Sequence, residues 1–226
     1  MTRLDYIASL VDERVVIDIG SDHGFLVKKL FDSNQIDCAF VTDISQKCLK
    51  KAKSNLTNYN NIIYLCGDGL NVFNNNLPAN LDKKYNNYMP NAVVIAGMGG
   101  EEIIKILSQK SAKHFNKFIL APQRNLVLVR EYLCKHNFEI VSDKVVKEGK
   151  MFYNVIVAIR SKTKQRLSEE ELVFGLTNIH SPDKDFLLYM QFLCKQYLEI
   201  LSNKEVSSIR AKYDMLQSIM QKNKKI

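Results

Sequence analysis

The sequence predicts an α/β protein, in which a doubly wound, mostly parallel seven-stranded sheet is followed by a C-terminal antiparallel helical hairpin. Short apolar runs without polar alternation recur as far as residue 121, which is typical of strands buried in a parallel sheet. Between them lie stretches with apolar residues three or four apart, which is typical of amphipathic helices. Strands and helices that alternate in this way pair in parallel through right-handed crossovers.

Five strands are expected in the parallel part of the sheet. They span residues 15–19, 38–42, 62–66, 92–96 and 118–121. The helices between them are expected at 24–33, 46–58, 101–111 and 126–136. The stretch 71–91 holds eight asparagines and little periodicity, so we expect a loop or a short irregular helix there.

The pattern changes after the fifth strand. Residues 138–146 and 153–159 flank a polar segment at 147–150, which predicts an antiparallel hairpin that closes the sheet. Residues 161–181 are expected to form a connector. It ends at Ser181-Pro182, where a proline after a capping residue predicts the start of a helix.

Two coiled-coil-like helices are expected at the C-terminus, joined around Ser202-Asn203. Their apolar residues alternate three- and four-residue steps, at Phe186, Met190, Leu193, Tyr197 and Ile200, then at Val206, Ile209, Tyr213, Leu216 and Met220. Each seam covers only two or three heptads, which favours a helical hairpin over a dimerising coiled coil. We therefore expect a monomer, with one domain at 1–160 and a helical domain at 161–226.

The composition excludes several classes of protein. With 46% hydrophobic and 25% charged residues and no apolar run near about 18 residues, the chain is not expected to span a membrane. Its first residues lack an apolar signal region, and its five cysteines form no Cys-x-x-Cys pair. A reducing, cytoplasmic location without disulfides is expected, and four scattered histidines predict no metal site.

The net charge of +8 favours a polyanionic partner such as RNA. The excess is spread along the chain and does not form a basic tail. A chain rich in Lys, Asn and Ile can carry such an excess without binding nucleic acid, so the charge alone leaves both interpretations open.

The first glycine cluster indicates which kind of cofactor the sheet binds. Ligands of doubly wound sheets lie beyond the carboxyl ends of the strands, where Asp18 and Asp22 surround Gly20. A dinucleotide pyrophosphate would be repelled by these two carboxylates. S-adenosylmethionine carries an ammonium and a sulfonium group, so it is favoured electrostatically.

The next two strand ends support the same cofactor. Asp43 is expected to accept hydrogen bonds from ribose hydroxyls, and Asp68 from the adenine amine. An aspartate at a strand end can instead cap a helix or form a turn, but three on consecutive strands favour a ligand site. The expected cofactor-binding residues are Asp18, Gly20, Ser21, Asp22, His23, Asp43, Ile44, Gly67, Asp68, Gly69, Ala96, Gly97 and Met98.

Five stretches carry a resemblance to the TrmK family, class I methyltransferases that act on N1 of adenine 22 in tRNA. They are Asp18-Ile19-Gly20-Ser21-Asp22-His23-Gly24-Phe25-Leu26, Gly67-Asp68-Gly69-Leu70, Ile95-Ala96-Gly97-Met98-Gly99-Gly100, Ala121-Pro122-Gln123-Arg124-Asn125 and Glu148-Gly149-Lys150-Met151-Phe152-Tyr153. The resemblance implies a Rossmann-like domain with a C-terminal helical hairpin. It also implies tRNA as substrate and position 22 as the target. Where the family has Gly-Glu at the end of the second strand, this chain has Thr42-Asp43. The exchange keeps the carboxylate that the ribose contact needs but shortens its reach.

The chemistry of this reaction needs alignment more than proton transfer. Adenine N1 has a free lone pair, so it can attack a sulfonium methyl group without a general base, and alignment can supply up to about 7–11 kcal/mol. Residues 96–99 offer no side-chain acceptor for an exocyclic amine, which suits a ring nitrogen. We expect Asp22, Met98 and Gly99 to position the reactants, and His23 to lie beside the cofactor without acting as a base. The glycines could equally serve tight packing.

The tRNA is expected to contact residues from several elements. The expected substrate-binding residues are Gln123, Arg124, Asn125, Arg130 and Tyr153. Phosphates are expected at Lys28, Lys29, Arg124, Arg130, Lys195, Arg210 and Lys212, although such residues can also be solvated helix faces. Asn125 could instead cap a helix, and Tyr153 could either stack on a flipped base or pack within its strand.

Three other functions remain open from the sequence. The chain could methylate a small molecule or another RNA, or it could be an RNA-binding module without catalysis. A nicotinamide-dependent oxidoreductase is disfavoured by Asp22.

Overall fold

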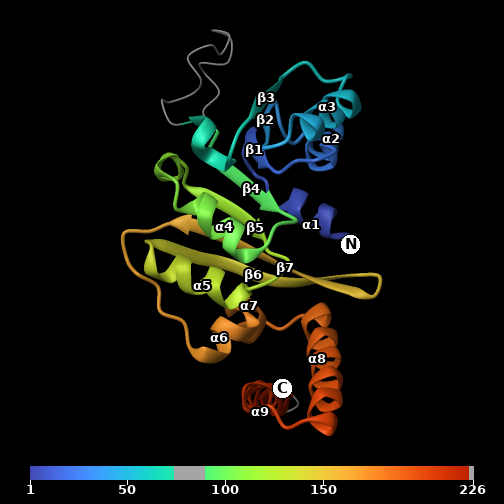
Figure 1. Ribbon diagram of the computed structural model, residues 1–226, viewed down its shortest axis with the longest axis vertical. Coiled ribbons are helices and arrows are strands. Elements are labelled where there is room, and N and C mark those ends of the chain that lie inside the picture. Colours follow the sequence, from blue (N-terminus) through green and yellow to red (C-terminus); the bar gives the residue numbers. More distant parts are fainter. Residues whose placement is uncertain (74–89, 224–226) are drawn as a thin grey trace.

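The seven strands form one sheet in the order β3-β2-β1-β4-β5-β7-β6. A computed structural model describes residues 1–73 and 90–223 (Figure 1). The strands are β1 (Val15–Ile19), β2 (Cys38–Asp43), β3 (Ile62–Cys66), β4 (Ala92–Ala96), β5 (Lys117–Ala121), β6 (Phe138–Glu148) and β7 (Met151–Arg160). The first five are parallel, and β7 is antiparallel to both of its neighbours, β5 and β6. The predicted doubly wound, mostly parallel sheet is therefore confirmed.

Helices cover both faces of the sheet (Figure 1). On one face, α4 (Gly100–Leu107) and α5 (Leu126–Lys135) bury residues such as Ile103 and Val129 against the strands. On the other face, α1 (Arg3–Ser9), α2 (Phe25–Asp32) and α3 (Gln46–Asn55) bury residues such as Ile7, Leu30 and Leu49. The two apolar layers explain why β1, β2, β4 and β5 lack alternation, since both of their faces are buried.

Three short elements were not predicted as such. Helix α1 starts at a capping box, in which Thr2 and Asp5 each bond the other's backbone N–H. The expected helix at 101–111 is divided into α4 and the 3₁₀ helix η3 (Lys110–His114). A second 3₁₀ helix, η1 (Gly69–Phe73), begins the asparagine-rich stretch, and residues 74–89 of that stretch lie outside the described residues.

The antiparallel hairpin is confirmed, with a tighter turn than expected. Glu148 pairs with Met151, so only residues 149 and 150 form the turn. The connector expected at 161–181 contains two short helices that were not predicted, α6 (Glu169–Phe174) and α7 (Leu176–His180). The next helix begins at Lys184 and not at Pro182, because the Asp183 side chain accepts a hydrogen bond from the Phe186 N–H at 3.0 Å.

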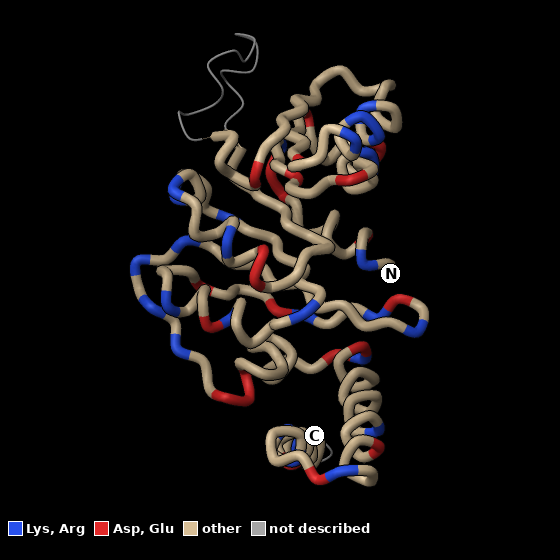
Figure 2. Tube along the Cα trace, in the orientation of Figure 1, with Lys and Arg blue, Asp and Glu red and all other residues tan. Residues whose placement is uncertain are grey.

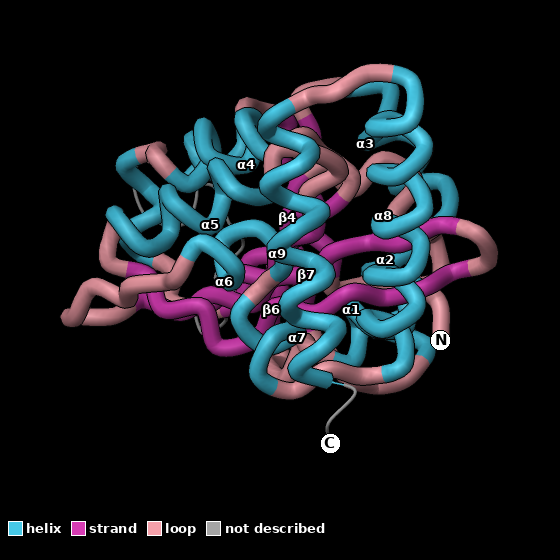
Figure 3. Tube along the Cα trace, turned by 90° about the horizontal axis from the view of Figure 1, so that it is seen from below, coloured by secondary structure: helices cyan, strands magenta, loops and turns pink. Residues whose placement is uncertain are grey.

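The two C-terminal helices form the predicted hairpin. Helices α8 (Lys184–Asn203) and α9 (Ser207–Asn223) lie side by side and run in opposite directions (Figure 3). Phe186, Met190 and Leu216 of the predicted seam are buried with Phe174 of α6. The far end of the seam is looser, since Ile200 is 42% exposed. A third apolar cluster therefore attaches the hairpin to β6 and α6.

No helix among the described residues is both long and apolar enough to cross a membrane. All five cysteines are described, and no disulfide joins any of them.

Candidate functional site

The parallel strands bring the predicted site residues to one edge of the sheet. Ile19 at the end of β1 is paired with Thr42 of β2 and with Ile95 of β4. Asp43, which ends β2, is paired with Cys66, which ends β3. The loops that follow these strands therefore share the carboxyl edge, where ligands of such sheets lie.

The loop after β1 has a backbone built from left-handed residues. Gly20, Asp22 and Gly24 have φ values of 71°, 45° and 72°. Aspartate is among the few residues that adopt this region readily, so Asp22 can occupy the place of a middle glycine. The N–H groups of Gly20 and Ser21 both donate to the Thr42 carbonyl, at 2.8 and 3.4 Å, which fixes the loop on β2.

Two clefts open on either side of Gly20. The first, of about 280 Å³, is lined by the loop after β1, by α1 and by Ala96 and Gly97. The second, of about 220 Å³, is lined by the loops after β2 and β3 and by Met98. Gly20 lines both, and a Cβ added there would collide with the Met98 methyl group. Met98 and Gly20 are thus brought together where the two clefts meet.

The first cleft contains a buried acid. Asp18 is only 5% exposed, and its carboxylate accepts a hydrogen bond from the Ser21 hydroxyl at 2.5 Å. Burial, opposed by this hydrogen bond and aided by the negative charge of Asp43, raises the pKa of Asp18 to about 6. Asp22 is more exposed, with His23 Nε2 at 3.5 Å and Lys51 Nζ at 3.9 Å from its carboxylate.

The second cleft brings together Asp43, Ile44 and Asp68. One carboxylate oxygen of Asp43 accepts the Ser45 N–H at 2.8 Å, so this residue does form a turn, as the alternative interpretation held. Its other oxygen takes no hydrogen bond from the described residues. Ile44 is 72% exposed at the cleft and presents an apolar surface to it.

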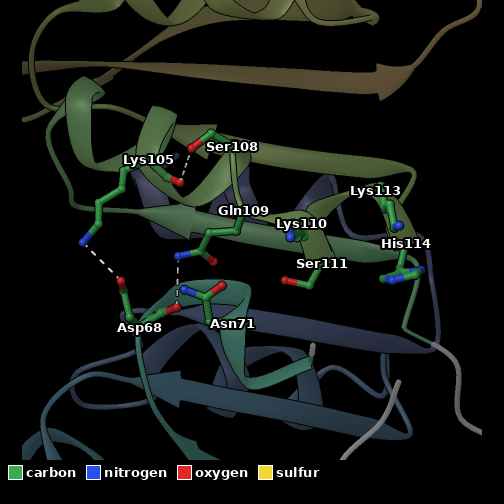
Figure 4. Close-up of a pocket in the computed structure, with 9 residues that line it drawn as sticks. All are labelled: Asp68, Asn71, Lys105, Ser108, Gln109, Lys110, Ser111, Lys113 and His114. Carbon is green, nitrogen blue, oxygen red and sulfur yellow. Dashed lines mark hydrogen bonds and ion pairs between the residues drawn. The ribbon is translucent and has the colours of Figure 1, made fainter. Parts of the chain in front are cut away.

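Asp68 also borders a larger groove that sequence analysis did not predict (Figure 4). This groove, of about 610 Å³, lies against η3, and Lys105, Lys110 and Lys113 give it a basic character. Lys105 forms an ion pair with Asp68 at 3.1 Å and lines the second cleft as well. The Gln109 amide donates to the Asp68 carbonyl at 3.1 Å and fixes the loop after β3.

Backbone hydrogen bonds join the loops after β4 and β5, which hold the expected positioning and substrate-binding residues. The Gln123 N–H donates to the Met98 carbonyl at 2.9 Å, and the Gly100 N–H donates to the Arg124 carbonyl at 3.0 Å. A Cβ on Gly100 would lie 2.8 Å from two carbonyl oxygens, so this glycine serves close packing. The Arg124 side chain lies next to Gly99. A Cβ added to Gly97 would meet no backbone atom within 4 Å.

Asn125 occupies the N-cap position of α5 but does not cap it with its side chain. Its φ is 59°, and its amide donates to the carboxylate of Glu101 in the first turn of α4. Gln123, Arg124 and Asn125 are all exposed at this edge.

Arg130 does not lie on the surface, so its assignment to tRNA binding is wrong. The side chain is 0% exposed, and its Nε and Nη2 groups donate to Asp143 at 2.7 and 2.9 Å. Its Nη1 group donates to the carbonyls of Leu172 and Val173. The guanidinium is therefore a core group that ties α6 to the sheet.

Several of the other expected phosphate ligands are already paired. Lys28 forms an ion pair with Asp32, Lys29 with Asp5, and Arg210 with Glu205. The lysines of α3, which sequence analysis did not select, are less engaged. Lys47, Lys50 and Lys53 are exposed and form no ion pair with a described carboxylate. A helix with four lysines and no acid was the available signal.

Tyr153 of β7 contacts Arg3, a residue that the sequence analysis did not select. The Arg3 guanidinium lies over its ring, 4.7 Å from the centroid. Arg3 also lines the first cleft, together with Asp18 and Asp22. His23 and Phe25 line the same cleft; their rings stack at 5.3 Å, and Phe25 is 57% exposed.

In residues 1–73 and 90–223, no three His, Cys, Asp or Glu side chains gather in a way that could hold a metal ion.

Comparison with known proteins agrees with this geometry. Residues 1–156 match the family model described as a methyltransferase domain. A Mycoplasma genitalium protein named as a tRNA methyltransferase is 34% identical over 199 residues, 86% of each chain. The tRNA (adenine(22)-N(1))-methyltransferase of Bacillus subtilis is 30% identical over 162 residues, 69% of this chain and 63% of the relative. The structure of M. capricolum TrmK with S-adenosyl-homocysteine superposes with a TM-score of 0.81 at 22% identity, covering 98% of this chain and 97% of that one.

Proposed function

The chain belongs to the TrmK family of tRNA methyltransferases, and from this premise we propose that it transfers a methyl group from S-adenosylmethionine to N1 of an adenine in tRNA, at position 22. The observation that carries the proposal is the set of carboxylates at the ends of β1, β2 and β3 around the bare backbone of Gly20. The name of the Bacillus subtilis relative supports the target position.

The residues present fit this cofactor. Asp18 and Asp22 provide negative charge in the first cleft, which suits the ammonium and sulfonium groups. The second cleft offers an unbonded oxygen of Asp43 for ribose hydroxyls and the exposed side chain of Ile44 for an adenine ring. When bound, S-adenosylmethionine supplies an electrophilic methyl group. Gly20 has no side chain that could come between its backbone and the cofactor, and its φ of 71° is one that favours glycine.

The protein's contribution to the reaction is alignment. Residues 97–99 border both clefts, since Gly97 lines the first and Met98 the second. The Gln123–Met98 and Gly100–Arg124 backbone hydrogen bonds fix their position. Asp22, Met98 and Gly99 position the reactants beside these residues, and no residue has to take a proton from adenine N1. Gln123, Arg124 and Asn125 are exposed beside them and contact the target nucleotide.

The tRNA lies over the carboxyl edge and over α3. The exposed lysines of α3 face solvent beside the loop after β1, and the Asn55 amide donates to the His23 carbonyl at 3.0 Å, which links the two segments. Phosphates of a folded RNA complement such a face. Residues 161–226 form the second unit of this proposal, a helical domain that reads the shape of the tRNA.

The test is methylation of unmodified tRNA by the purified protein with methyl-labelled S-adenosylmethionine, followed by nucleoside analysis. We expect the label in 1-methyladenosine, and none in a transcript that carries guanine at position 22. Label in another nucleoside would refute the proposed target. Binding of tRNA without binding of S-adenosylhomocysteine would instead indicate an RNA-binding module.

A further inference from the structure

The groove beside η3 has no role in the proposed methyl transfer (Figure 4). Its volume of about 610 Å³ exceeds that of either cleft. Only Asp68 and Lys105 of its described lining residues also line the second cleft. The others are Asn71, Ser108, Gln109, Lys110, Ser111, Lys113 and His114. The groove therefore adjoins the second cleft but is formed largely by residues that line neither cleft.

The groove carries an excess of positive charge. Three lysines and one aspartate line it, and this aspartate, Asp68, is already paired with Lys105 at 3.1 Å. Lys110 and Lys113 are exposed and form no ion pair with a carboxylate in residues 1–73 or 90–223. His114, at the end of η3, adds a ring N–H donor. Cations that are not neutralised in a concave surface attract anionic ligands.

Hydrogen bonds hold the two walls of the groove together. Ser111 is buried, and its hydroxyl donates to the Leu70 carbonyl at 2.6 Å. The Gln109 side chain accepts the Leu70 N–H at 2.6 Å and donates to the Asp68 carbonyl at 3.1 Å. These bonds join η3 and the residue before it to η1, so the groove is formed without a ligand.

The cations are spread along the groove and do not converge on one point. Lys110 and Lys113 are three residues apart in η3, and residues with this spacing lie on the same side of a 3₁₀ helix. Lys105 belongs to α4, and Figure 4 shows it at the opposite end of the groove from Lys113 and His114. A row of cations suits several linked phosphates better than a single phosphate. No Phe, Tyr or Trp is among the described residues that line the groove, so it does not favour stacked bases.

We propose that this groove binds a row of linked phosphates, either the backbone of an RNA strand or a free polyphosphate such as that of a nucleotide. The RNA source rests on the proposed function, whereas the free polyphosphate does not. The fold supports the RNA source, because η1 and η3 pack on the face of the sheet that α4 and α5 cover, and α3 packs on the other face. An RNA strand in the groove, together with phosphates on α3, would contact both sides of the sheet.

The experiment compares double variants that differ in place and not in charge. The groove variant, Lys110→Gln with Lys113→Gln, removes two lysines that line neither cleft. The control, Lys162→Gln with Lys164→Gln, removes two exposed lysines outside the groove. A third variant, Lys110→Arg with Lys113→Arg, keeps the charge of the groove. All three should unfold within a few degrees of the unmodified protein, because the replaced side chains are exposed.

Two ligands are titrated while S-adenosylhomocysteine saturates the clefts. Filter binding measures tRNA over a range of salt concentrations, and calorimetry measures inorganic tripolyphosphate. We expect the groove variant to weaken tRNA binding and to make the dependence of log affinity on log salt concentration shallower by about 2, against less than about 1 in the control. Its affinity for tripolyphosphate should fall by about 10-fold or more, as for loss of charge-assisted hydrogen bonds. The arginine variant should bind both ligands as the unmodified protein does.

The outcomes distinguish the two phosphate sources and separate the inference from the proposed function. Loss of tRNA affinity, with or without loss of tripolyphosphate affinity, assigns the groove to RNA. Loss of tripolyphosphate affinity alone assigns it to a free polyphosphate. Unchanged affinity for both ligands would overturn the inference, as would an equal loss in the control or in the arginine variant. Failure of the unmodified protein to bind S-adenosylhomocysteine would refute the proposed function and leave the tripolyphosphate result as the test of the groove.

Discussion

Asp18 ties the stability of the folded chain to pH. Burial raises the pKa of its carboxyl group from the ordinary 3.8 to about 6. The protonated form is therefore favoured in the folded protein, and the resulting stability, fully present below pH 3.8, is lost as the pH rises through about 6. Between these limits the loss amounts to about 3 kcal/mol.

Replacing Asp18 with asparagine should remove this loss while keeping an acceptor for the Ser21 hydroxyl. We expect Asp18→Asn to be more stable than the unmodified protein at pH 8, by up to about 3 kcal/mol, and to show little advantage near pH 4. Denaturant unfolding at both pH values measures this, with the exposed Asp214→Asn as control. An advantage independent of pH would contradict the assignment. Cofactor affinity should fall at pH 8, where the carboxylate would otherwise be ionised.

Asp22 combines a backbone role with a charge, and two substitutions separate them. Its φ of 45° is tolerated by asparagine but costs alanine about 1–2 kcal/mol. We expect Asp22→Asn and Asp22→Ala both to weaken S-adenosylhomocysteine binding, because both remove the charge. Only Asp22→Ala should lower the unfolding free energy. Equal stability of the two variants would show that the loop is free to change its backbone conformation.

At the scale of the elements, helix α6 is attached to the sheet through one buried ion pair. Arg130 and Asp143 are fully buried, and Arg130 also bonds the carbonyls of Leu172 and Val173. We expect Arg130→Met to destabilise the protein by about 3–5 kcal/mol, because the Asp143 carboxylate would be left without its buried partner. The double variant Arg130→Met with Asp143→Asn should recover much of this cost in denaturant unfolding. A single variant within about 0.5 kcal/mol of the unmodified protein would contradict this role.

The strands and helices differ in how well the sequence alone predicts them. The parallel strands were predictable, because β1, β2, β4 and β5 are buried on both faces and therefore read as short apolar runs, and the half-buried edge strand β3 is equally apolar. Helices α6 and α7 were missed because five or six residues give too little periodicity, although the Ser168–Glu171 capping box was a signal for α6. Helix α1 left the same kind of signal in Thr2 and Asp5.

The candidate site was predictable for the same physical reason, and only in part. Residues that follow strands reach the carboxyl edge in any parallel sheet, so Asp18, Asp43 and Asp68 could be selected from the sequence. Arg3 could not, because its place in the cleft depends on how α1 packs against the β6–β7 hairpin. The burial of Arg130 likewise depends on residues about 40 positions away, and a charged helical residue alone predicts exposure.

At the scale of the whole molecule, the position of the charges matters more than their sum. Figure 2 shows lysines gathered on α3, a helix that follows Asp43 at the carboxyl edge. The loop at 161–168 also carries three basic residues, Lys162, Lys164 and Arg166. Lys117, at the start of β5, is paired with Ile159, so this loop leaves the sheet at the opposite, amino edge. The chain thus offers two basic segments, with four and three basic residues, and three of the α3 lysines can be matched by the three basic residues of the loop.

Removal of three charges from each segment allows a controlled test of the tRNA surface. We expect the triple variant Lys47→Gln, Lys50→Gln, Lys53→Gln to weaken tRNA binding and to make the dependence of log affinity on log salt concentration shallower by about 2–3, since each phosphate contact contributes about one. The control, Lys162→Gln, Lys164→Gln, Arg166→Gln, removes the same charge at the amino edge and should change the slope by less than about 1. Filter binding of tRNA over a range of salt concentrations measures both.

Equal changes of the salt dependence in the two triple variants would mean that tRNA affinity depends only on net charge. Such a result would contradict the assignment of α3 to the tRNA-binding surface. A change confined to the α3 variant would orient the tRNA over the carboxyl edge, beside the two clefts. Because α3 touches the loop after β1 through Asn55 and His23, phosphates bound there would lie close to the methyl-transfer site. Cofactor affinity supplies the internal check, since Lys47, Lys50 and Lys53 line neither cleft and S-adenosylhomocysteine should bind both triple variants equally well.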